Sequence, residues 1–452
     1  MTRLHFASAL LPSGWANDVQ VLITAGAIAE VTPGVLPAAG DERHAIALPG
    51  LASLHSHAFQ RGMAGLAELR GDSTDTFWTW RETMYRFALA MTPDDMTAVA
   101  TLLYVEMLEQ GFTRVGEFHY LHHDRDGSHY ADIGEMAACI AQAAEASSIA
   151  LTLLPSFYAH GSFGGAAPHD GQRRFICSVD QFARLMSASR KAIASLPGAN
   201  IGVAPHSLRA VTPDELAAIV PLADGGPVHI HAAEQVKEVE DCLAWSGRRP
   251  VQWLLEHAPL DRRWCLIHAT HTTDAEIAAF AKTGAVAGLC PVTEASLGDG
   301  IFPAREFLAA GGAFGIGTDS NVLVGVADEL RQLEYGQRLK HRQRNVLSGG
   351  AGRSTGRTLF DHALAGGARA LAQPTIGLMP GARADIVTLD ISHPSLAGRT
   401  RDAVIDGWIF AAGGGVIDCV WAGGDKVVEG GRHRLRQAAR ERFNASVRRL
   451  VA

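Results

Sequence analysis

The feature that most constrains the fold of this 452-residue chain is an alternation of short apolar runs with longer amphipathic stretches, between about residues 48 and 373. Such alternation is typical of parallel β-strands joined by helices, and over this length it predicts an α/β fold, a distorted (β/α)8 barrel of the TIM type. Helices are expected within residues 94–111 and 179–196. Strands are predicted at residues 45–55, 113–120, 150–158, 200–207, 227–234, 264–270, 285–293 and 313–321.

The two ends of the chain have a different pattern of apolar and polar residues. Residues 4–47 and 381–433 contain short alternating runs separated by Gly, Pro and Asn, which predict small β-strands with tight turns. We expect both ends to combine in one small β-sandwich beside the barrel. The predicted domains are residues 1–48 and 376–452 for the two parts of the β domain, with the barrel at 49–375.

The composition narrows the possible partners and surroundings. Hydrophobic residues make up 47% of the chain and charged residues 19%, as in well-packed globular proteins. The net charge of -7 gives no field that would attract nucleic acid or a membrane surface. No apolar run is long enough to span a bilayer, and no secretory signal is recognised, so a cytoplasmic protein is expected. The six cysteines lack C-x-x-C spacing, which predicts reduced, buried thiols.

Histidines and an aspartate stand at the ends of several predicted strands. His55 and His57 end the first strand two residues apart, so their side chains point to the same side. An isolated pair of this kind is more often a pair of ordinary polar residues than a metal site. His231, His268 and Asp319, however, end three further strands, and barrel strands converge at their carboxyl ends. The set therefore predicts an open catalytic site for a divalent ion.

These motifs together resemble the amidohydrolase superfamily. The pattern PG-x-x-x-x-H-x-H at the first strand, the later strand-end residues, and the stretch G-x-x-ADIV-x-LD at residues 381–390 all match, over essentially the whole chain. The resemblance implies that His55, His57, His231 and Asp319 bind the metal. Zinc is the expected ion, and the same ligands also accept Fe²⁺ or Mn²⁺.

The resemblance also implies the number of ions and the catalytic residues. Two-metal members of the superfamily have a bridging lysine or acidic residue near the fourth strand, where this chain has His206 and no lysine, so one ion is expected. The H-x-x-E spacing of His231 and Glu234 resembles the deaminase branch, in which the glutamate shuttles a proton to the departing nitrogen. The expected catalytic residues are then Glu234, His268 and Asp319, although Glu234 could instead be an ordinary surface acid.

Three segments, at residues 54–68, 155–165 and 204–211, resemble the formimidoylglutamate deiminase family of bacterial histidine degradation. That family hydrolyses N-formimidoyl-L-glutamate to N-formyl-L-glutamate and ammonia. The resemblance implies that the substrate is a small acidic molecule and that the enzyme is a homodimer. The implied substrate contacts are Gln60, Arg81, Tyr120, His206 and Arg209.

The residues themselves agree with this substrate. A dicarboxylate needs cationic anchors, and the planar guanidinium of Arg209 can hold a carboxylate through two charge-assisted hydrogen bonds. A surface or structural ion pair is the alternative for this arginine. In the expected reaction, Asp319 and His268 orient and deprotonate a water activated by the ion, and Glu234 gives a proton to the departing amino group.

Two other functions are compatible with parts of the pattern. A deaminase or halide-displacing hydrolase acting on a purine, pterin or triazine ring would use the same ion, whereas Arg81, Tyr120 and Arg209 favour an acidic, flexible substrate. A non-catalytic barrel scaffold would have lost metal ligands that this chain retains. Five further histidines are expected on loops near the catalytic face and are not assigned to the site: His119, His122, His123, His160 and His169.

Overall fold

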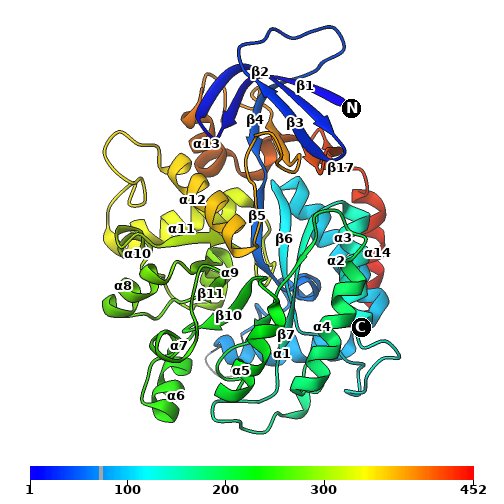
Figure 1. The fold of residues 1–452 in the computed structure, drawn as a ribbon, viewed down its shortest axis with the longest axis vertical. Coiled ribbons are helices and arrows are strands. Elements are labelled where there is room, and N and C mark those ends of the chain that lie inside the picture. Colours follow the sequence, from blue (N-terminus) through cyan, green and yellow to red (C-terminus); the bar gives the residue numbers. More distant parts are fainter. Residues whose placement is uncertain (71–74) are drawn as a thin grey trace.

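The computed structural model describes residues 1–70 and 75–452, and its centre is a ring of parallel strands with helices outside it (Figure 1). All the predicted strand regions contain strands. The ring strands are β5 (Leu51–Ser56), β6 (Phe112–His119), β7 (Ala150–Phe157), β8 (Asn200–Ile201), β9 (Ala204–Pro205), β10 (Val228–Ala232), β11 (Trp264–His268), β12 (Val286–Leu289) and β13 (Ala313–Ile316).

The ring consists of two parallel sheets, β5 to β9 and β10 to β13, which individual backbone hydrogen bonds and isolated bridges connect at two seams. At one seam the carbonyl of His55 accepts hydrogen bonds from the N–H groups of Thr318 and Asp319, each at 3.0 Å. At the other seam the N–H of Val203 donates to the carbonyl of Pro227 at 2.9 Å. The seams have isolated bridges rather than full ladders, so the barrel is distorted, as the sequence predicted.

Two strand predictions need correction. The segment at residues 200–207 is not one strand, because β8 ends before Gly202, where a side chain would collide with the carbonyl of Pro227. The segment at residues 45–55 is divided at Gly50, where a side chain would collide with Thr113. Its first part is β4 (Glu42–Pro49), which belongs to the flanking sheet, and only its second part, β5, belongs to the ring.

The flanking sheet is built from both ends of the chain, as predicted, and lies beside the start of β5 (Figure 1). Its order is β17-β16-β15-β14-β4-β1-β2-β3, so β4 pairs with the C-terminal strand β14. The domain boundaries near residues 48 and 375 stay predictions. The remaining strands of the sheet are β1 (Thr2–Leu11), β2 (Gly14–Thr24), β3 (Ala27–Thr32), β14 (Ile386–Leu389), β15 (Ile417–Ala422), β16 (Asp425–Glu429) and β17 (Arg432–His433).

Helices cover the outside of the ring, and several of them begin with a capping box. The hydroxyls of Thr92, Ser178 and Thr273 each accept a hydrogen bond from the third backbone N–H of the helix that follows. The helices are α1 (Phe77–Ala90), α2 (Pro93–Glu109), α3 (Glu135–Ser147), α4 (Val179–Ile193), α5 (Pro213–Ile219), α6 (Val236–Ser246), α7 (Pro250–His257), α8 (Asp274–Thr283), α9 (Pro291–Leu297), α10 (Ala304–Ala309), α11 (Val326–His341), α12 (Thr355–Ala370), α13 (Asp402–Gly407) and α14 (Arg436–Val451).

The state of the cysteines and the apolar length of the helices are both visible in the structure. All six cysteines are buried and free, as expected. In the part of the chain that the structure describes, no helix combines the length and the apolar character needed to cross a bilayer.

The C-terminal helix α14 was not predicted from the sequence. It lies against α2 on the outside of the barrel, where Ala439 packs on Leu102 and Val105 (Figure 1). Only a narrow stripe of α14 is buried, and most of its other residues are charged or polar. Its apolar period is therefore too weak to recognise, because one alanine at the centre of a contact carries little hydrophobic signal.

We expect Ala439→Asp to lower the free energy of unfolding by about 3 kcal/mol, since it places an unpaired charge in this apolar contact. Chemical denaturation followed by circular dichroism measures the change. Ala438→Asp is the matched control, because Ala438 lies on the exposed side of the same helix. Equal stabilities of the two variants would contradict the packing of α14 on α2.

Candidate active site

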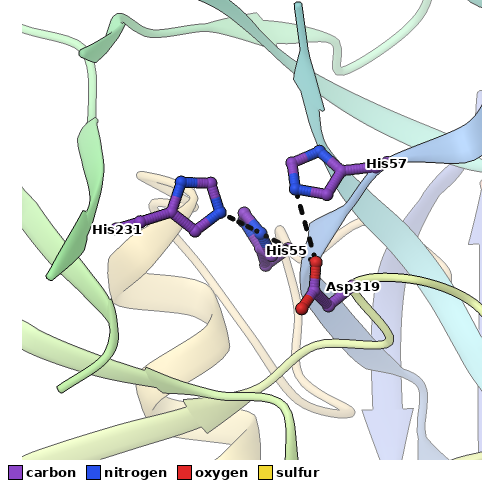
Figure 2. A group of neighbouring side chains, drawn as sticks. All are labelled: His55, His57, His231 and Asp319. Atoms are coloured by element: carbon purple, nitrogen blue, oxygen red, sulfur yellow. Dashed lines mark hydrogen bonds and ion pairs between the residues drawn. The ribbon is translucent and has the colours of Figure 1, made fainter. Parts of the chain in front are cut away.

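Four side chains at the carboxyl ends of ring strands converge on one point (Figure 2). The candidate ligand atoms of His55, His57, His231 and Asp319 all lie within 4.8 Å of one another. Oδ1 of Asp319 is 3.3 Å from Nε2 of His55 and 3.3 Å from Nε2 of His57. Nε2 of His231 is 3.1 Å from Nε2 of His55. Three imidazoles and one carboxylate so arranged form a donor set for a divalent ion.

Backbone carbonyls fix the orientation of two of these rings. Nδ1–H of His57 donates to the carbonyl of Phe118 at 2.8 Å, and Nδ1–H of His231 donates to the carbonyl of His206 at 2.8 Å. The lone pairs on Nε2 are thereby turned toward the cluster. Burial lowers the pKa of all three histidines, that of His55 to about 3, so the rings are neutral, as metal binding requires. The residues fit a bound divalent ion.

The backbone near the cluster adopts conformations that are rare for side-chain-bearing residues. His268 has φ 67° and Asp319 has φ 44°, both in the left-handed region. Gly317 allows β13 to approach β5 closely, because a Cβ there would come within 2.8 Å of the Cβ of His55. Such local strain is typical of functional sites and requires support from the surrounding structure.

His268 lies among three carboxylates beside the cluster. Its Nε2 is 3.6 Å from Oε1 of Glu234 and 3.7 Å from Oδ2 of Asp319, and its Nδ1 is 3.2 Å from Oε1 of Glu294. Burial alone would lower the pKa of His268, but the carboxylates raise it to about 10. Burial raises the pKa of Glu234 to about 7, so this carboxyl can hold or release a proton near neutral pH.

One cavity brings the predicted site residues together. It reaches the metal cluster through His57, His231 and Asp319, and it contains Glu234 and His268 in its wall. Every residue predicted to contact substrate also lines it: Gln60, Arg81, Tyr120, His206 and Arg209. The roles of these residues remain predictions, while their placement in one cavity is observed.

The two arginines lie on the same side of this cavity. Arg209 is only 7% exposed, and its Nη2 is 3.8 Å from Oε2 of Glu234, so it is not a surface residue. Its guanidinium carbon lies 5.7 Å from the ring centre of Trp78, and that of Arg81 lies 4.5 Å from the same ring. Glu234 is 4% exposed, which also excludes the surface-acid alternative.

Sequence reasoning missed a buried acid that supports Glu234. Glu238 is fully buried in α6 and accepts hydrogen bonds from the backbone N–H groups of Ala233, at 3.1 Å, and Glu234, at 3.0 Å. Its only signal in the sequence is an acidic residue next to Val239 and four residues before Cys242, on the apolar side of the helix. Glu238 thus holds the turn that places Glu234 in the cavity.

The histidines left unassigned are not part of the cavity lining. His119, His122 and His123 were expected on or near loops above the catalytic face, where each could touch substrate or be solvated, and all three are buried. Nε2–H of His122 donates to the carbonyl of Ser156, and Nε2–H of His123 donates to that of Ile176, each at 2.8 Å. His160 pairs with Glu215, while His169 is exposed. These contacts are structural.

We expect Glu238→Gln to lower kcat by about tenfold or more, because the variant loses a charge-assisted hydrogen bond that positions Glu234. Metal content should not change. Steady-state kinetics together with metal analysis test this, with Glu240→Gln, an exposed position of the same helix, as control. Unaltered kcat in Glu238→Gln would show that this contact does not position Glu234.

His231→Asn should remove most of the bound metal, whereas His268→Asn should retain about one ion per chain, because only His231 belongs to the four-residue cluster. Elemental analysis of the purified variants measures the difference. Loss of the metal in His268→Asn together with its retention in His231→Asn would instead favour the neighbouring group of His268, Cys290 and Asp319 as ligands.

Comparison with known proteins identifies the family of this chain. Residues 46–427 match the model of the amidohydrolase family, and the chain belongs to this family. Residues 1–45 match the N-terminal domain of the formimidoylglutamate deiminase HutF. A formimidoylglutamate deiminase from Pseudomonas aeruginosa is 51% identical over 435 residues, covering 96% of each chain.

Other relatives are more distant or have less specific names. A 5-methylthioadenosine/S-adenosylhomocysteine deaminase from Natronomonas pharaonis is 28% identical, covering 90% of this chain and 89% of its own. A solved amidohydrolase from Brucella melitensis is 59% identical, with a TM-score of 0.97 over the whole of both chains. An adenosine deaminase from Xanthomonas campestris shares the fold, with a TM-score of 0.80 at 22% identity and 99% and 98% coverage.

Proposed function

We propose that this chain is a metal-dependent deiminase that converts N-formimidoyl-L-glutamate and water to N-formyl-L-glutamate and ammonia, in histidine degradation. The observation that carries the proposal is a cavity that joins two arginines to a buried proton-transfer group and a metal-ligand cluster. The formimidoylglutamate deiminase from Pseudomonas aeruginosa, similar over nearly the full length, supports the same substrate.

The charge of the cavity distinguishes this substrate from the alternatives. Arg81 and Arg209 would serve two carboxylates, whereas a neutral purine, pterin or triazine ring would leave the buried charge of Arg209 without a partner from the ligand. The complete set of ligand-type residues argues against a scaffold protein that has lost its metal. An acidic, flexible substrate therefore matches the site best.

The residues of the cavity account for each proton in the reaction. A divalent ion held by His55, His57, His231 and Asp319 would supply Lewis-acid activation of the attacking water. His268 and Asp319, whose Nε2 and Oδ2 atoms are 3.7 Å apart, orient the water, and the carboxylate of Asp319 takes up its proton. Attack on the formimidoyl carbon forms the C–O bond and leaves a tetrahedral centre with an amino group.

Glu234 completes the reaction in this scheme. It gives a proton to the amino group, the C–N bond breaks and ammonia leaves, and the hydroxyl of the intermediate returns a proton to the Glu234 carboxylate as the formyl carbonyl forms. Since burial raises its pKa to about 7, Glu234 can carry that proton at neutral pH. Arg209, 3.8 Å from Glu234, would bind one carboxylate of the substrate.

We also propose the identity of the bound ion, the number of chains in the enzyme and its compartment in the cell. The His₃Asp donor set suits Zn²⁺, and Fe²⁺ or Mn²⁺ are the alternatives. A cytoplasmic homodimer is proposed on the resemblance to the superfamily. Elemental analysis identifies the ion, and light scattering on the purified protein determines the number of chains.

Incubation of the purified enzyme with N-formimidoyl-L-glutamate tests the reaction. We expect ammonia and N-formyl-L-glutamate in equal amounts. Formamide and glutamate would mean that the other C–N bond is cut, and turnover of an aromatic amine without turnover of the formimidoyl compound would favour the ring deaminase. No turnover of either would overturn the proposal.

Glu234→Gln should largely abolish turnover while metal content stays near that of the wild type. Glutamine cannot transfer the proton, and Glu234 is not one of the four clustered ligand residues. Rapid-quench kinetics and elemental analysis of the same preparation check both parts. If the variant lost its metal, Glu234 would be a ligand or a support of the cluster rather than a proton shuttle.

A further inference from the structure

Three side chains of the ligand type come together in the flanking sheet, away from the catalytic cavity. A ring nitrogen of His44, a carboxylate oxygen of Asp418 and the sulfur of Cys419 all lie within 4.8 Å of one another. His44 belongs to β4, and the other two are adjacent residues of β15. The flanking sheet lies beside the start of β5, whereas His55 lies near the end of that strand (Figure 1). The group is therefore separate from the active site.

A carboxylate behind the ring of His44 determines which of its nitrogens can bind an ion. Nε2 of His44 is 3.1 Å from Oε1 of Glu42. Burial opposes the ionisation of Glu42, but hydrogen bonds from Lys426 and His44 hold its pKa below the usual value, so the carboxylate is ionised. An ionised carboxylate can only accept, so Nε2 carries the proton and Nδ1 keeps a free lone pair. The same arrangement of carboxylate and imidazole orients metal-binding histidines in general.

The distance between His44 and Asp418 fits two ligands of one ion better than a hydrogen bond. Nδ1 of His44 is 3.9 Å from Oδ2 of Asp418, which is too far for a hydrogen bond. Two atoms bound to one tetrahedral zinc ion at about 2.1 Å are about 3.4 Å from each other. The side chain of Asp418 is 38% exposed, so a small rotation of this side chain closes the difference.

Cys419 supplies the ligand that decides the kind of ion. Its thiol is free, and the residue is only 3% exposed. Burial raises the pKa of Cys419 to about 11, so the thiol keeps its proton until an ion displaces it. Binding is therefore expected to release a proton and to strengthen as the pH rises. A set of imidazole nitrogen, carboxylate oxygen and thiolate sulfur suits Zn²⁺ rather than Mg²⁺ or Ca²⁺.

The charges around the group favour a cation. Nζ of Lys426 is 2.9 Å from Oε1 of Glu42 and 2.8 Å from Oε1 of Glu429, so two carboxylates neutralise this ammonium group. Asp418 adds a third carboxylate, and within the described residues its ion-pair partner is the ring of His44. Because His44 does not carry the positive charge that would balance Asp418, a divalent ion between them would be stabilised by the local field.

We propose that His44, Asp418 and Cys419 form a second zinc site, with water as the fourth ligand. β4 and β15 are not neighbours in the sheet, because β14 lies between them, so the ion links strands from the two ends of the chain directly. An ion that binds only the folded protein stabilises it by mass action. The second site does not depend on the proposed function, since none of its three residues lines the catalytic cavity.

Cobalt(II) distinguishes the second site from the active site by its absorption spectrum. A thiolate bound to Co²⁺ gives a strong charge-transfer band in the near ultraviolet, and the four-residue cluster of the active site contains no cysteine. We expect Co²⁺ added to the enzyme with a loaded active site to produce this band, with saturation at one added ion per chain.

Two cysteine variants identify the source of the band. Cys419→Ser should remove it, whereas Cys290→Ser, which changes the cysteine beside His268 and Asp319, should leave it in place. Absence of the band in the wild type would overturn the proposal. So would a band that disappears in Cys290→Ser and persists in Cys419→Ser, because the thiolate ligand would then belong to the active site.

Asp418→Asn tests the site without changing a buried residue. Calorimetry with Zn²⁺, on enzyme that retains about one ion per chain after dialysis against a weak chelator, should show one further ion in the wild type. The affinity should fall by about tenfold or more in Asp418→Asn, because a neutral amide is a weaker ligand than a carboxylate. Asp425→Asn, with the same change of charge at an exposed position of β16, is the matched control and should bind as the wild type does.

The melting temperature gives a second measurement on the same proteins. Added Zn²⁺ should raise it in the wild type and in Asp425→Asn, and by a smaller amount or not at all in Asp418→Asn. Equal zinc affinities and equal shifts of the melting temperature in all three proteins would overturn the second site.

Discussion

The backbone contact between β5 and β13 is the interaction on which the site depends. The carbonyl of His55 receives the N–H groups of Thr318 and Asp319, and this closes the ring and brings a carboxylate against two histidines in one step. Gly317 is required for that approach, because any side chain there would collide with His55. A ligand cluster assembled from main-chain hydrogen bonds is stiff, and stiffness keeps the four donors at one spacing.

Around this cluster, buried carboxylates and amides fix the orientation of neighbouring side chains through hydrogen bonds, in addition to any effect of their charge. Glu238 fixes the turn that carries Glu234, and Glu294 holds the far side of the His268 ring. Gln172, whose Nε2 donates to the phenol oxygen of Tyr158, has the same kind of role for that side chain. Each supporting group is buried and directs a residue of the cavity, so a conservative change in the supporting residues is expected to act on catalysis or selectivity before it acts on the fold.

The parts of the molecule that the sequence could predict are those with strong periodicity. The H-x-H pair and the later strand-end residues follow from the two-residue repeat of strands and the convergence of a parallel barrel. The break at Gly50 could not be seen, because two collinear strands in different sheets have the same apolar pattern. Glu238 and Gln172 were missed because a buried polar residue has no pattern of its own, and its role depends on which backbone groups the fold brings to it. The helix α14 was missed because Ala439 is its one buried residue, and the apolar side chains beside it, Leu435 and Phe443, are only partly buried.

The pairing of β4 with β14 has a consequence for synthesis of the chain. β4 leads through Gly50 directly into the strand that carries His55, yet one of its two neighbours in the sheet begins only at Ile386. Until the ribosome has made that residue, β4 has an unpaired edge, which is a template for wrong pairing with other chains. The first metal-binding strand is thus tied to a part of the protein made very late, and a truncated chain would lack both the edge partner and a complete support for the site.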